Sequence, residues 1–337
     1  MNELTKKTAK RGFKLGDNGV RIIAFIVILG ALALINPTVL SLVNLFGTLN
    51  NAAFVGVVSM GLMIVMITGN LDLSLISISL MGGYTSIMVC INMGWDDVSF
   101  FVMFAIAAVV GLVCGLVNAF FVYRFNIPGI IVSLGMAQIY NSVLLVATGV
   151  TYIPVIPTGM RHFGRTYIFS VETDIGIASI NLSVAFFAGA ILLVWFVLNK
   201  TMVGRGIYAL GGDKEAAARA GFNIPFVYSV AYGIMGLLAG IAGMMFYANS
   251  LNFQSDPILT EQGNAIAGAI FGGVIMKNGK GTVGGVVVGV LLIGLINNNL
   301  YLIGVPSYAQ KLVVGVIILV SVALTSINQL REARKNR

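Results

Sequence analysis

Long apolar runs, separated by short polar stretches, dominate the chain. A bilayer core about 30 Å thick needs about 20 apolar residues per helix, and shorter spans are possible inside a bundle. Ten segments meet this requirement: residues 20–35, 52–69, 72–92, 99–123, 128–148, 182–199, 226–248, 262–276, 283–303 and 308–327. The pattern predicts an all-α polytopic membrane protein with about ten transmembrane helices.

The same pattern divides the chain into a transmembrane domain over residues 20–327 and two basic tails, 1–19 and 328–337. No cleavage site made of small residues follows the first apolar run cleanly. We therefore expect the N-terminal stretch to form the first helix and its cytoplasmic anchor, not a cleaved signal peptide.

The composition excludes a water-soluble protein. Hydrophobic residues make up 58% of the 337 positions and charged residues only 9%, whereas soluble domains carry about 25% charged residues. A soluble core of this size could not hide so much apolar surface, so lipid must cover it. The net charge of +8 would suggest a nucleic-acid partner in a soluble protein. In a membrane protein the position of each charge is more informative than the total, and we expect no nucleic-acid partner.

The basic residues set the orientation, because cytoplasmic loops collect Lys and Arg. If the N-terminus lies inside and the chain crosses ten times, 17 of the 20 basic residues are cytoplasmic. They are Lys6, Lys7, Lys10, Arg11, Lys14, Arg21, Arg124, Lys200, Arg205, Lys214, Arg219, Lys277, Lys280, Arg331, Arg334, Lys335 and Arg337. The acidic residues on the outer side are Asp96, Asp97, Glu172, Asp174, Asp256 and Glu261. The charges predict cytoplasmic N- and C-termini.

Glycine spacing indicates close helix packing. Small residues four apart let membrane helices approach through their backbones, and the chain has four such pairs: Gly111/Gly115, Gly236/Gly240, Gly268/Gly272 and Gly285/Gly289. We interpret them as packing contacts, with a gating role for one pair as the alternative.

A faint internal duplication accompanies the glycines. Asn118 precedes Pro128 after one Gly-rich helix, and Asn297 precedes Pro306 after another. Five helices lie between the equivalents, so the two copies would have opposite orientations, as in many transporters. An inverted five-helix repeat is therefore possible.

The chemistry of an enzyme is missing from the sequence. Lys277–Thr282 resembles a phosphate-binding loop but has Val274 where the first glycine is needed and Gly281 where Ser or Thr must follow the lysine. His162 has no partner with metal-ligand spacing, and Cys90 and Cys114 lie in apolar runs. We expect no catalytic site, no metal and no cofactor bound by this chain.

Ionisable residues are also scarce inside the apolar segments. Ion-coupled carriers need such groups, and here only Asp72 lies near the inner boundary of a helix. The scarcity argues against an ion-coupled carrier. Energy for transport would then come from a partner.

The largest polar segment predicted to be cytoplasmic is the loop over residues 200–225. Asp213 is placed to cap a short helix of strong helix formers, and Gly221 is placed to end it. A helix of two turns is too short to be stable alone, so we expect it to pack against something; a plain surface loop is the alternative.

Here the residues resemble a known family. The segment 208–221 resembles the coupling loop of permease subunits of bacterial binding-protein-dependent ABC importers of ribose, xylose and galactose. It reads Tyr-Ala-Leu-Gly-Gly-Asp-Lys-Glu-Ala-Ala-Ala-Arg-Ala-Gly, and the resemblance rests on Glu215, Ala216, Ala217 and Gly221. Thr68–Ser74 is similar to the Gly-x-Asp-Leu-Ser signature of that subfamily, and Phe271–Gly273 and Gly279–Gly285 agree with it. The resemblance covers about residues 50–325.

The resemblance implies a permease of the bacterial inner membrane that works as a pair, with a second copy or a homologue. Two cytoplasmic ATPase subunits would use the ATP, and a periplasmic or lipid-anchored binding protein would deliver a sugar. Asp213, Glu215, Ala216, Ala217 and Gly221 would form the ATPase-coupling loop. The related branched-chain amino acid permeases are the alternative of the same class, and a non-transporting membrane scaffold is an alternative of another class.

Two further groups of polar residues are candidate functional positions. Asp72 and Ser74 would either cap the third helix or line an inner gate. Amides and hydroxyls inside the helices suit an uncharged polyol, although membrane amides also hold helices together. The candidate pathway residues are Asn51, Tyr84, Gln138, Asn141, Asn264, Asn297 and Asn298.

Overall fold

The computed structural model describes residues 17–95, 97–148, 157–251 and 261–306, with single positions at 309, 310, 312, 315, 316 and 319. The elements of these ranges, in chain order, are α1 (Asp17–Ile35), η1 (Pro37–Leu40), α2 (Leu42–Ile67), α3 (Leu75–Asn92), α4 (Phe100–Phe125), α5 (Gly129–Thr148), α6 (Thr158–Arg165), β1 (Tyr167–Thr173), β2 (Gly176–Asn181), α7 (Leu182–Lys200), α8 (Met202–Gly212), α9 (Lys214–Arg219), α10 (Ile224–Ser250), α12 (Glu261–Phe271) and α13 (Val283–Leu302).

Seven of the described helices are long and apolar enough to cross a membrane, namely α2, α3, α4, α5, α7, α10 and α13. The chain is therefore a polytopic helical membrane protein, as its apolar pattern predicts. α1 coincides with the first predicted span, and its apolar part over Arg21–Ile35 is shorter than the seven. The tenth predicted span, 308–327, lies almost entirely outside the described residues.

The predicted span over residues 262–276 is wrong as one continuous helix. α12 ends at Phe271, and its 11 residues cover only about 17 Å at 1.5 Å per residue, much less than a bilayer core. Gly273 then adopts a φ of +77°, a left-handed conformation that ends the helix, and Ile275 pairs with Lys280 across a tight turn. The apolar residues beyond Phe271 belong to this turn.

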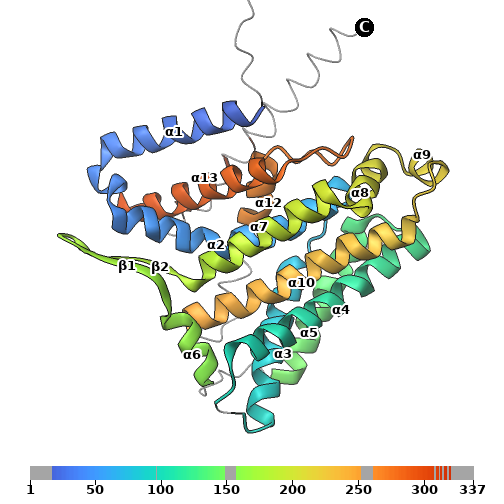
Figure 1. The fold of residues 1–337 in the computed structure, drawn as a ribbon, viewed down its shortest axis with the longest axis horizontal. Helices are drawn as coiled ribbons and strands as arrows, with labels where there is room; N and C mark the ends of the chain where they lie inside the picture. Colours follow the sequence, from blue (N-terminus) through green and yellow to red (C-terminus); the bar gives the residue numbers. More distant parts are fainter. Residues whose placement is uncertain are drawn as a thin grey trace, which may run out of the picture.

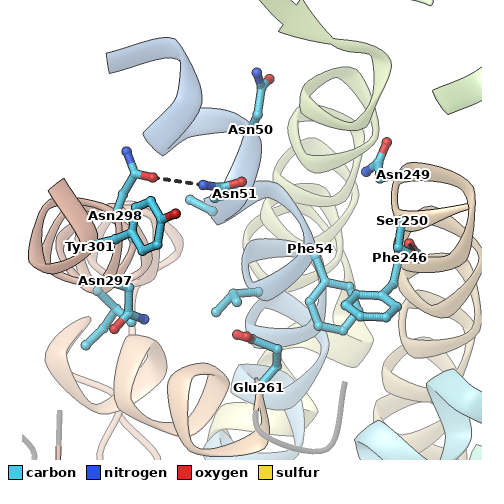
Figure 2. Close-up of a pocket in the computed structure, with 14 residues that line it drawn as sticks. Asn50, Asn51, Phe54, Phe246, Asn249, Ser250, Glu261, Asn297, Asn298 and Tyr301 are labelled. Atoms are coloured by element: carbon cyan, nitrogen blue, oxygen red, sulfur yellow. Dashed lines mark hydrogen bonds between the residues drawn. The ribbon is translucent and has the colours of Figure 1, made fainter. Parts of the chain in front are cut away.

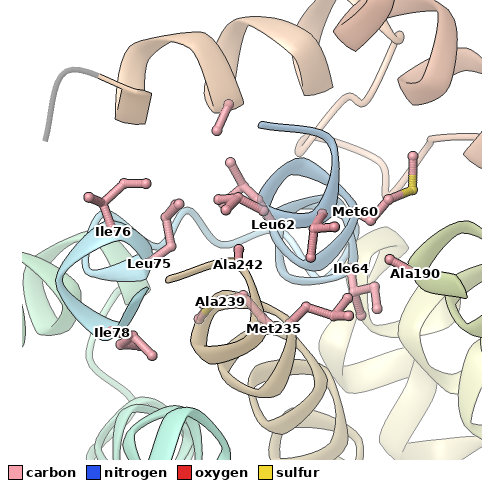
Figure 3. Close-up of a cluster of buried hydrophobic side chains, with 14 of the residues drawn as sticks. Met60, Leu62, Ile64, Leu75, Ile76, Ile78, Ala190, Met235, Ala239 and Ala242 are labelled. Atoms are coloured by element: carbon pink, nitrogen blue, oxygen red, sulfur yellow. The ribbon is translucent and has the colours of Figure 1, made fainter. Parts of the chain in front are cut away.

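α2 is the central helix of the bundle. Of its most apolar 18-residue stretch, 89% is buried inside the protein, compared with 28% for α5 and for α7. Figure 3 shows Met60, Leu62 and Ile64 of α2 surrounded by side chains of α3, α7 and α10. The outer faces of α4, α5 and α7 remain apolar and exposed, as lipid-facing surfaces require.

The glycine pairs form close helix contacts, as their spacing predicts. A methyl group added to Gly111 of α4 would overlap the carbonyl oxygen of Gly236 of α10. One added to Gly289 of α13 would overlap the carbonyl oxygen of Gly268 of α12. Only glycine allows these backbones to touch, and van der Waals contact at such crossings stabilises membrane bundles.

A β-hairpin and the short helices α6, α8 and α9 complete the described fold. β1 and β2 pair antiparallel from Tyr167↔Asn181 to Thr173↔Gly176, and α6 precedes them. Figure 1 shows this hairpin at one end of the long helices and α8 and α9 at the other. The apolar-run criterion did not predict the hairpin, because its strands are short and lie between membrane spans.

Candidate functional site

A cavity of about 620 Å³ opens at the hairpin end of the bundle, between α2, α10, α12 and α13 (Figure 2). Its wall consists of amide, hydroxyl, carboxyl and aromatic side chains over an apolar floor. The lining residues are Asn50, Asn51, Ala52, Phe54, Val55, Phe246, Asn249, Ser250, Glu261, Ile293, Gly294, Asn297, Asn298 and Tyr301. The charge pattern predicts that this end faces the outside.

Asparagines join α2 to α13 at the mouth of the cavity. Asn51 Nδ2 donates to Asn298 Oδ1 at 3.0 Å, and Asn298 Nδ2 donates to Asn44 Oδ1 at 2.7 Å. Asn44 Nδ2 in turn donates to Asn299 Oδ1 at 3.0 Å. Two of the predicted pathway residues, Asn51 and Asn298, therefore border the cavity and also hold two helices together.

The hairpin is attached to the same mouth. Asn50 Nδ2 donates to the carbonyl of Ser179 at 2.8 Å, and the backbone N–H of Asn181 donates to Asn50 Oδ1 at 2.9 Å. The outer end of α2 and β2 are thus one connected unit. Sequence reasoning missed Asn50, since nothing distinguishes it from its neighbour before the hairpin is known.

Glu261 supplies the carboxylate of the cavity wall. It is the first residue of α12, and Figure 2 shows its side chain directed toward the cavity. Asn264 Nδ2, one helical turn later, donates to Glu261 Oε2 at 2.8 Å. Asn264 is thus a predicted pathway residue that reaches the cavity through Glu261, which the sequence indicated only as an outer acid.

The other predicted pathway residues lie elsewhere. Asn297 lines the cavity, but Tyr84 is buried on α3 and Gln138 is exposed on α5. Asn141, also on α5, has a buried Oδ1 atom without a hydrogen-bond partner in the described structure. None of these last three residues borders the cavity, and their role in a pathway stays a prediction.

Asp72 forms a buried hydrogen-bond cluster at the opposite end of α2. Its Oδ1 accepts from the Ser74 N–H at 2.7 Å and from Ser74 Oγ at 2.6 Å, and its Oδ2 accepts from Asn118 Nδ2 at 2.9 Å. Tyr140 donates its hydroxyl to Asn118 Oδ1 at 3.0 Å. The cluster joins the start of α3 to α4 and α5.

This geometry changes the predicted cap of the third helix. α3 begins at Leu75, and Ser74 stands at its N-cap position without a capping hydrogen bond from its side chain. Asp72 instead fixes the turn before the helix through Ser74. Both side chains are completely buried, so an inner-gate role would require the junction to open.

The short helix predicted in the 200–225 loop is present as α9. Asp213 Oδ1 accepts from the Ala216 N–H at 2.8 Å, which lowers the pKa of this exposed carboxyl. Gly221 follows the helix with a φ of +88°, and Ala217 is the buried residue of its inner face. Glu215 makes an exposed 3.5 Å ion pair with Arg219.

The preceding part of the loop is also helical, which the sequence did not predict. α8 begins after Thr201, whose side chain accepts from the Gly204 N–H at 3.1 Å. Its glycines lower the helix propensity of the segment, but they allow close packing. A methyl group on Gly211 would overlap the carbonyl oxygen of Ile67 at the end of α2. Tyr208 donates its hydroxyl to the Gly281 carbonyl at 2.9 Å.

These contacts form the α8 joint, which we define as Tyr208 and Gly211 with their partners Ile67, Gly279 and Gly281. It links α8 to the end of α2 and to the turn before α13. Both of those helices line the outer cavity at their other ends. The α8 joint and the cavity therefore lie at opposite ends of the same two helices.

Metal ligation has no candidate in the described ranges, where no group of three or more His, Cys, Asp or Glu side chains could hold an ion. Cys90 and Cys114 are both buried and unpaired by a disulfide. The described residues of the site therefore offer amides, hydroxyls, aromatic rings and one carboxylate.

Comparison with known proteins decides the family. The profile of the family described as "Branched-chain amino acid transport system / permease component" matches residues 44–322. The chain belongs to this permease family. It is accordingly a membrane permease component and not an enzyme.

Curated relatives match the permease over nearly its whole length. The ribose import permease protein RbsC of Escherichia coli (strain K12) is 29% identical over 316 residues, which cover 91% of this chain and 93% of the relative. The galactose/methyl galactoside import permease protein MglC of the same organism is 29% identical over 351 residues, covering 98% and 100%. The autoinducer 2 import system permease protein LsrC of Yersinia pseudotuberculosis is 27% identical, covering 89% and 82%. No solved structure matches the permease.

Proposed function

We propose that this permease is the membrane-spanning subunit of an ATP-driven sugar importer. The observation that carries the proposal is the match, over at least 89% of the chain, to proteins named as import permeases for ribose, galactose and autoinducer 2. The chain offers no nucleotide-binding loop of its own. ATP would accordingly be used by separate subunits, with no cofactor bound here.

The arrangement of the described residues supports this function. A polar cavity lies at one end of α2, and α9 projects with exposed charges at the other end. The α8 joint connects the two. If α9 seats in a groove of an ATPase, closure of the ATPases moves α8, and α8 moves α2 and α13.

The finer organisation belongs to the same proposal. Ten helices would place both termini in the cytoplasm, with basic tails at 1–19 and 328–337 around a domain over 20–327. The segment 200–225 would be the cytoplasmic coupling loop. Two permeases would stand on two ATPases in the bacterial inner membrane and receive cargo from a periplasmic or lipid-anchored binding protein.

A branched-chain amino acid is the second candidate cargo, because the family description names it. The outer cavity argues against this cargo, since its described lining residues include no Lys, Arg or His to balance the carboxylate of an amino acid. A non-transporting scaffold is disfavoured because the chain matches nearly the whole length of relatives that are named as import permeases.

Reconstitution of the importer tests the proposal. The permease would be expressed with the candidate ATPase and binding protein of its own cells, purified and placed in liposomes. We expect sugar-loaded binding protein to stimulate ATP hydrolysis and the uptake of D-ribose or D-galactose. Uptake of L-leucine instead would support the hypothesis of an amino acid cargo. A rate of ATP hydrolysis that does not change when loaded binding protein is added would support the scaffold hypothesis.

A further inference from the structure

We propose that Glu261 makes the outer cavity selective for uncharged polyhydroxyl cargo, by accepting hydroxyl hydrogens and repelling anions. The proposal rests on the proposed import function and assigns the specificity to a residue of this chain. The cavity volume of about 620 Å³ falls within the range of about 300–1,000 Å³ typical of small-molecule sites.

The position of the carboxylate is the first argument. Glu261 begins α12 and faces the cavity between α2 and α10 (Figure 2). The 2.8 Å hydrogen bond from Asn264 to Oε2 fixes its orientation. An ionised carboxylate only accepts hydrogen bonds and has about four acceptor positions, so acceptor capacity remains for a ligand. Hydroxyl groups that donate to a carboxylate form short, charge-assisted hydrogen bonds.

The aromatic part of the wall provides the second argument. The rings of Phe54 and Phe246 lie 5.4 Å apart at an angle of 56°, and both border the cavity. A monosaccharide has C–H faces that pack on such rings and hydroxyl edges that need polar partners. Small-molecule sites combine these two kinds of surface, with a few polar groups that set orientation.

The charge of the wall is the third argument. Among the residues that the structure describes, the lining includes one carboxylate and no Lys, Arg or His. An anionic cargo would place a second negative charge near Glu261 without a partner, and unpaired charges in a partly desolvated site are costly. A zwitterionic amino acid could pair its ammonium with Glu261 but would leave its own carboxylate unbalanced.

A cation would satisfy Glu261 but not the rest of the wall. Asn297 borders the cavity, and its amide makes no hydrogen bond within the described structure. A side-chain amide offers two N–H donors as well as an acceptor. A cation has no use for those donors, whereas the oxygen atoms of a polyol accept from them.

The experiment measures the electrostatics and the occupancy of the cavity without transport. Ser250, a lining residue on α10, is replaced in the full chain as Ser250→Cys, and the unmodified chain gives the background because Cys90 and Cys114 are buried. Labelling rates are compared for a positively charged trimethylammonium ethyl methanethiosulfonate and a negatively charged sulfonatoethyl methanethiosulfonate. D-Ribose, D-galactose, D-ribose 5-phosphate, L-leucine and choline are then added at millimolar concentration.

We expect Glu261→Gln to lower the ratio of cation to anion labelling by about three- to tenfold, because one nearby charge is lost. Glu261→Asp, which keeps the charge, should preserve the ratio. Glu172→Gln is the matched control, since it removes an exposed outer carboxylate on β1 that does not border the cavity. The melting temperature shows that each variant is folded.

The two sugars should slow labelling of the parent chain, and this protection should weaken in Glu261→Gln. The proposal is overturned if the ratio is insensitive to Glu261→Gln, or if D-ribose 5-phosphate, L-leucine or choline protects as well as the sugars. The assay needs no ATP and no partner. A reconstituted importer that fails to take up sugar would refute the proposed function and leave the labelling result standing.

Discussion

The outer end of α2 borders a cavity, whereas its inner end is held tightly by neighbouring backbone. Asn51 at the outer end donates its amide to Asn298, and both residues border a cavity of about 620 Å³. Ile67 at the inner end touches Gly211 so closely that one added methyl group would collide. The two ends therefore differ in packing: a cavity lies beside the outer end, whereas the inner end has no room for one added methyl group at Gly211.

The same contrast holds for charge. Glu261 is held by one amide at the edge of a cavity, while Asp72 is completely buried and accepts hydrogen bonds from Ser74 and Asn118. A buried carboxylate that is fully hydrogen-bonded fixes one arrangement of its neighbours. We infer that the outer end is built for recognition and the inner end for transmission of force.

The largest effect is expected from Asp72→Ala. The substitution removes the acceptor of the Ser74 N–H and of the Ser74 hydroxyl, while Asn118 Nδ2 loses one of its two acceptors and keeps Ser74 Oγ. Each buried donor left unsatisfied costs about 1–3 kcal/mol. Thermal unfolding of the purified permease should show a large loss of stability. Asp174→Ala, which removes an exposed carboxylate at the tip of the hairpin, should change little. Equal melting temperatures for the two variants would contradict the assigned rigidity of the inner end.

The second effect concerns the α8 joint. Gly211→Ala places a methyl group against the Ile67 carbonyl, whereas nothing lies within 4 Å of a methyl group on the adjacent Gly212. Both substitutions raise helix propensity equally, so they differ only in this collision, which costs about 1–3 kcal/mol as overpacking.

We expect Gly211→Ala to reduce sugar uptake while ATP hydrolysis continues, because the added methyl group forces α8 away from its contact with the end of α2. Gly212→Ala should transport as the parent does. Uptake and hydrolysis would be measured in the same proteoliposomes. Normal coupled uptake by Gly211→Ala would show that the joint does not transmit motion.

Sequence alone predicted much of the inner end. Asp213, Gly221 and the helix between them follow local rules of capping and termination, and the structure has α9 where those rules place it. α8 escaped prediction because Gly204 and Gly211 lower helix propensity, and their benefit exists only through contact with Val197, Leu198 and Ile67.

The cavity was less predictable than the coupling loop. Amides at Asn51, Asn297 and Asn298 drew attention because polar groups are rare in such helices, but Tyr84 and Gln138 satisfied the same criterion and lie elsewhere. Which amides share a cavity depends on the crossing of four helices, and no local rule encodes that crossing. Glu261 was overlooked as a site residue because an acid at the outer boundary fits the charge rule without any further role.

The third effect separates two neighbouring amides at the outer end. Asn298 donates to Asn44 and Thr48, so Asn298→Ala should destabilise the permease by about 0.6–1.7 kcal/mol, the usual range for interhelical hydrogen bonds in membranes. Asn297 has no hydrogen bond within the described structure, so Asn297→Ala should leave thermal stability unchanged and raise the sugar concentration needed for half-maximal uptake. Destabilisation by both variants to the same extent would make the outer amides purely structural.

The smallest effect on stability is expected at α9. Glu215 and Arg219 have side chains that are 85% and 71% exposed and form a 3.5 Å ion pair within one helical turn, and such pairs contribute about 0.3–0.5 kcal/mol. α9 is held instead by the buried Ala217 and the Asp213 cap. The free energy of unfolding of Arg219→Ala should therefore lie within about 0.5 kcal/mol of the parent's.

If α9 seats in an ATPase, the same variant should nevertheless retain less ATPase during copurification, because the exposed charges then face a partner. Glu172→Ala, an exposed acid at the opposite end of the molecule, should retain it fully. Since Arg219 contributes so little to the permease itself, any loss of ATPase reports the contact alone. Full retention by Arg219→Ala would place the contact on another face of the loop and leave the α8 joint as the remaining link between the two ends of α2.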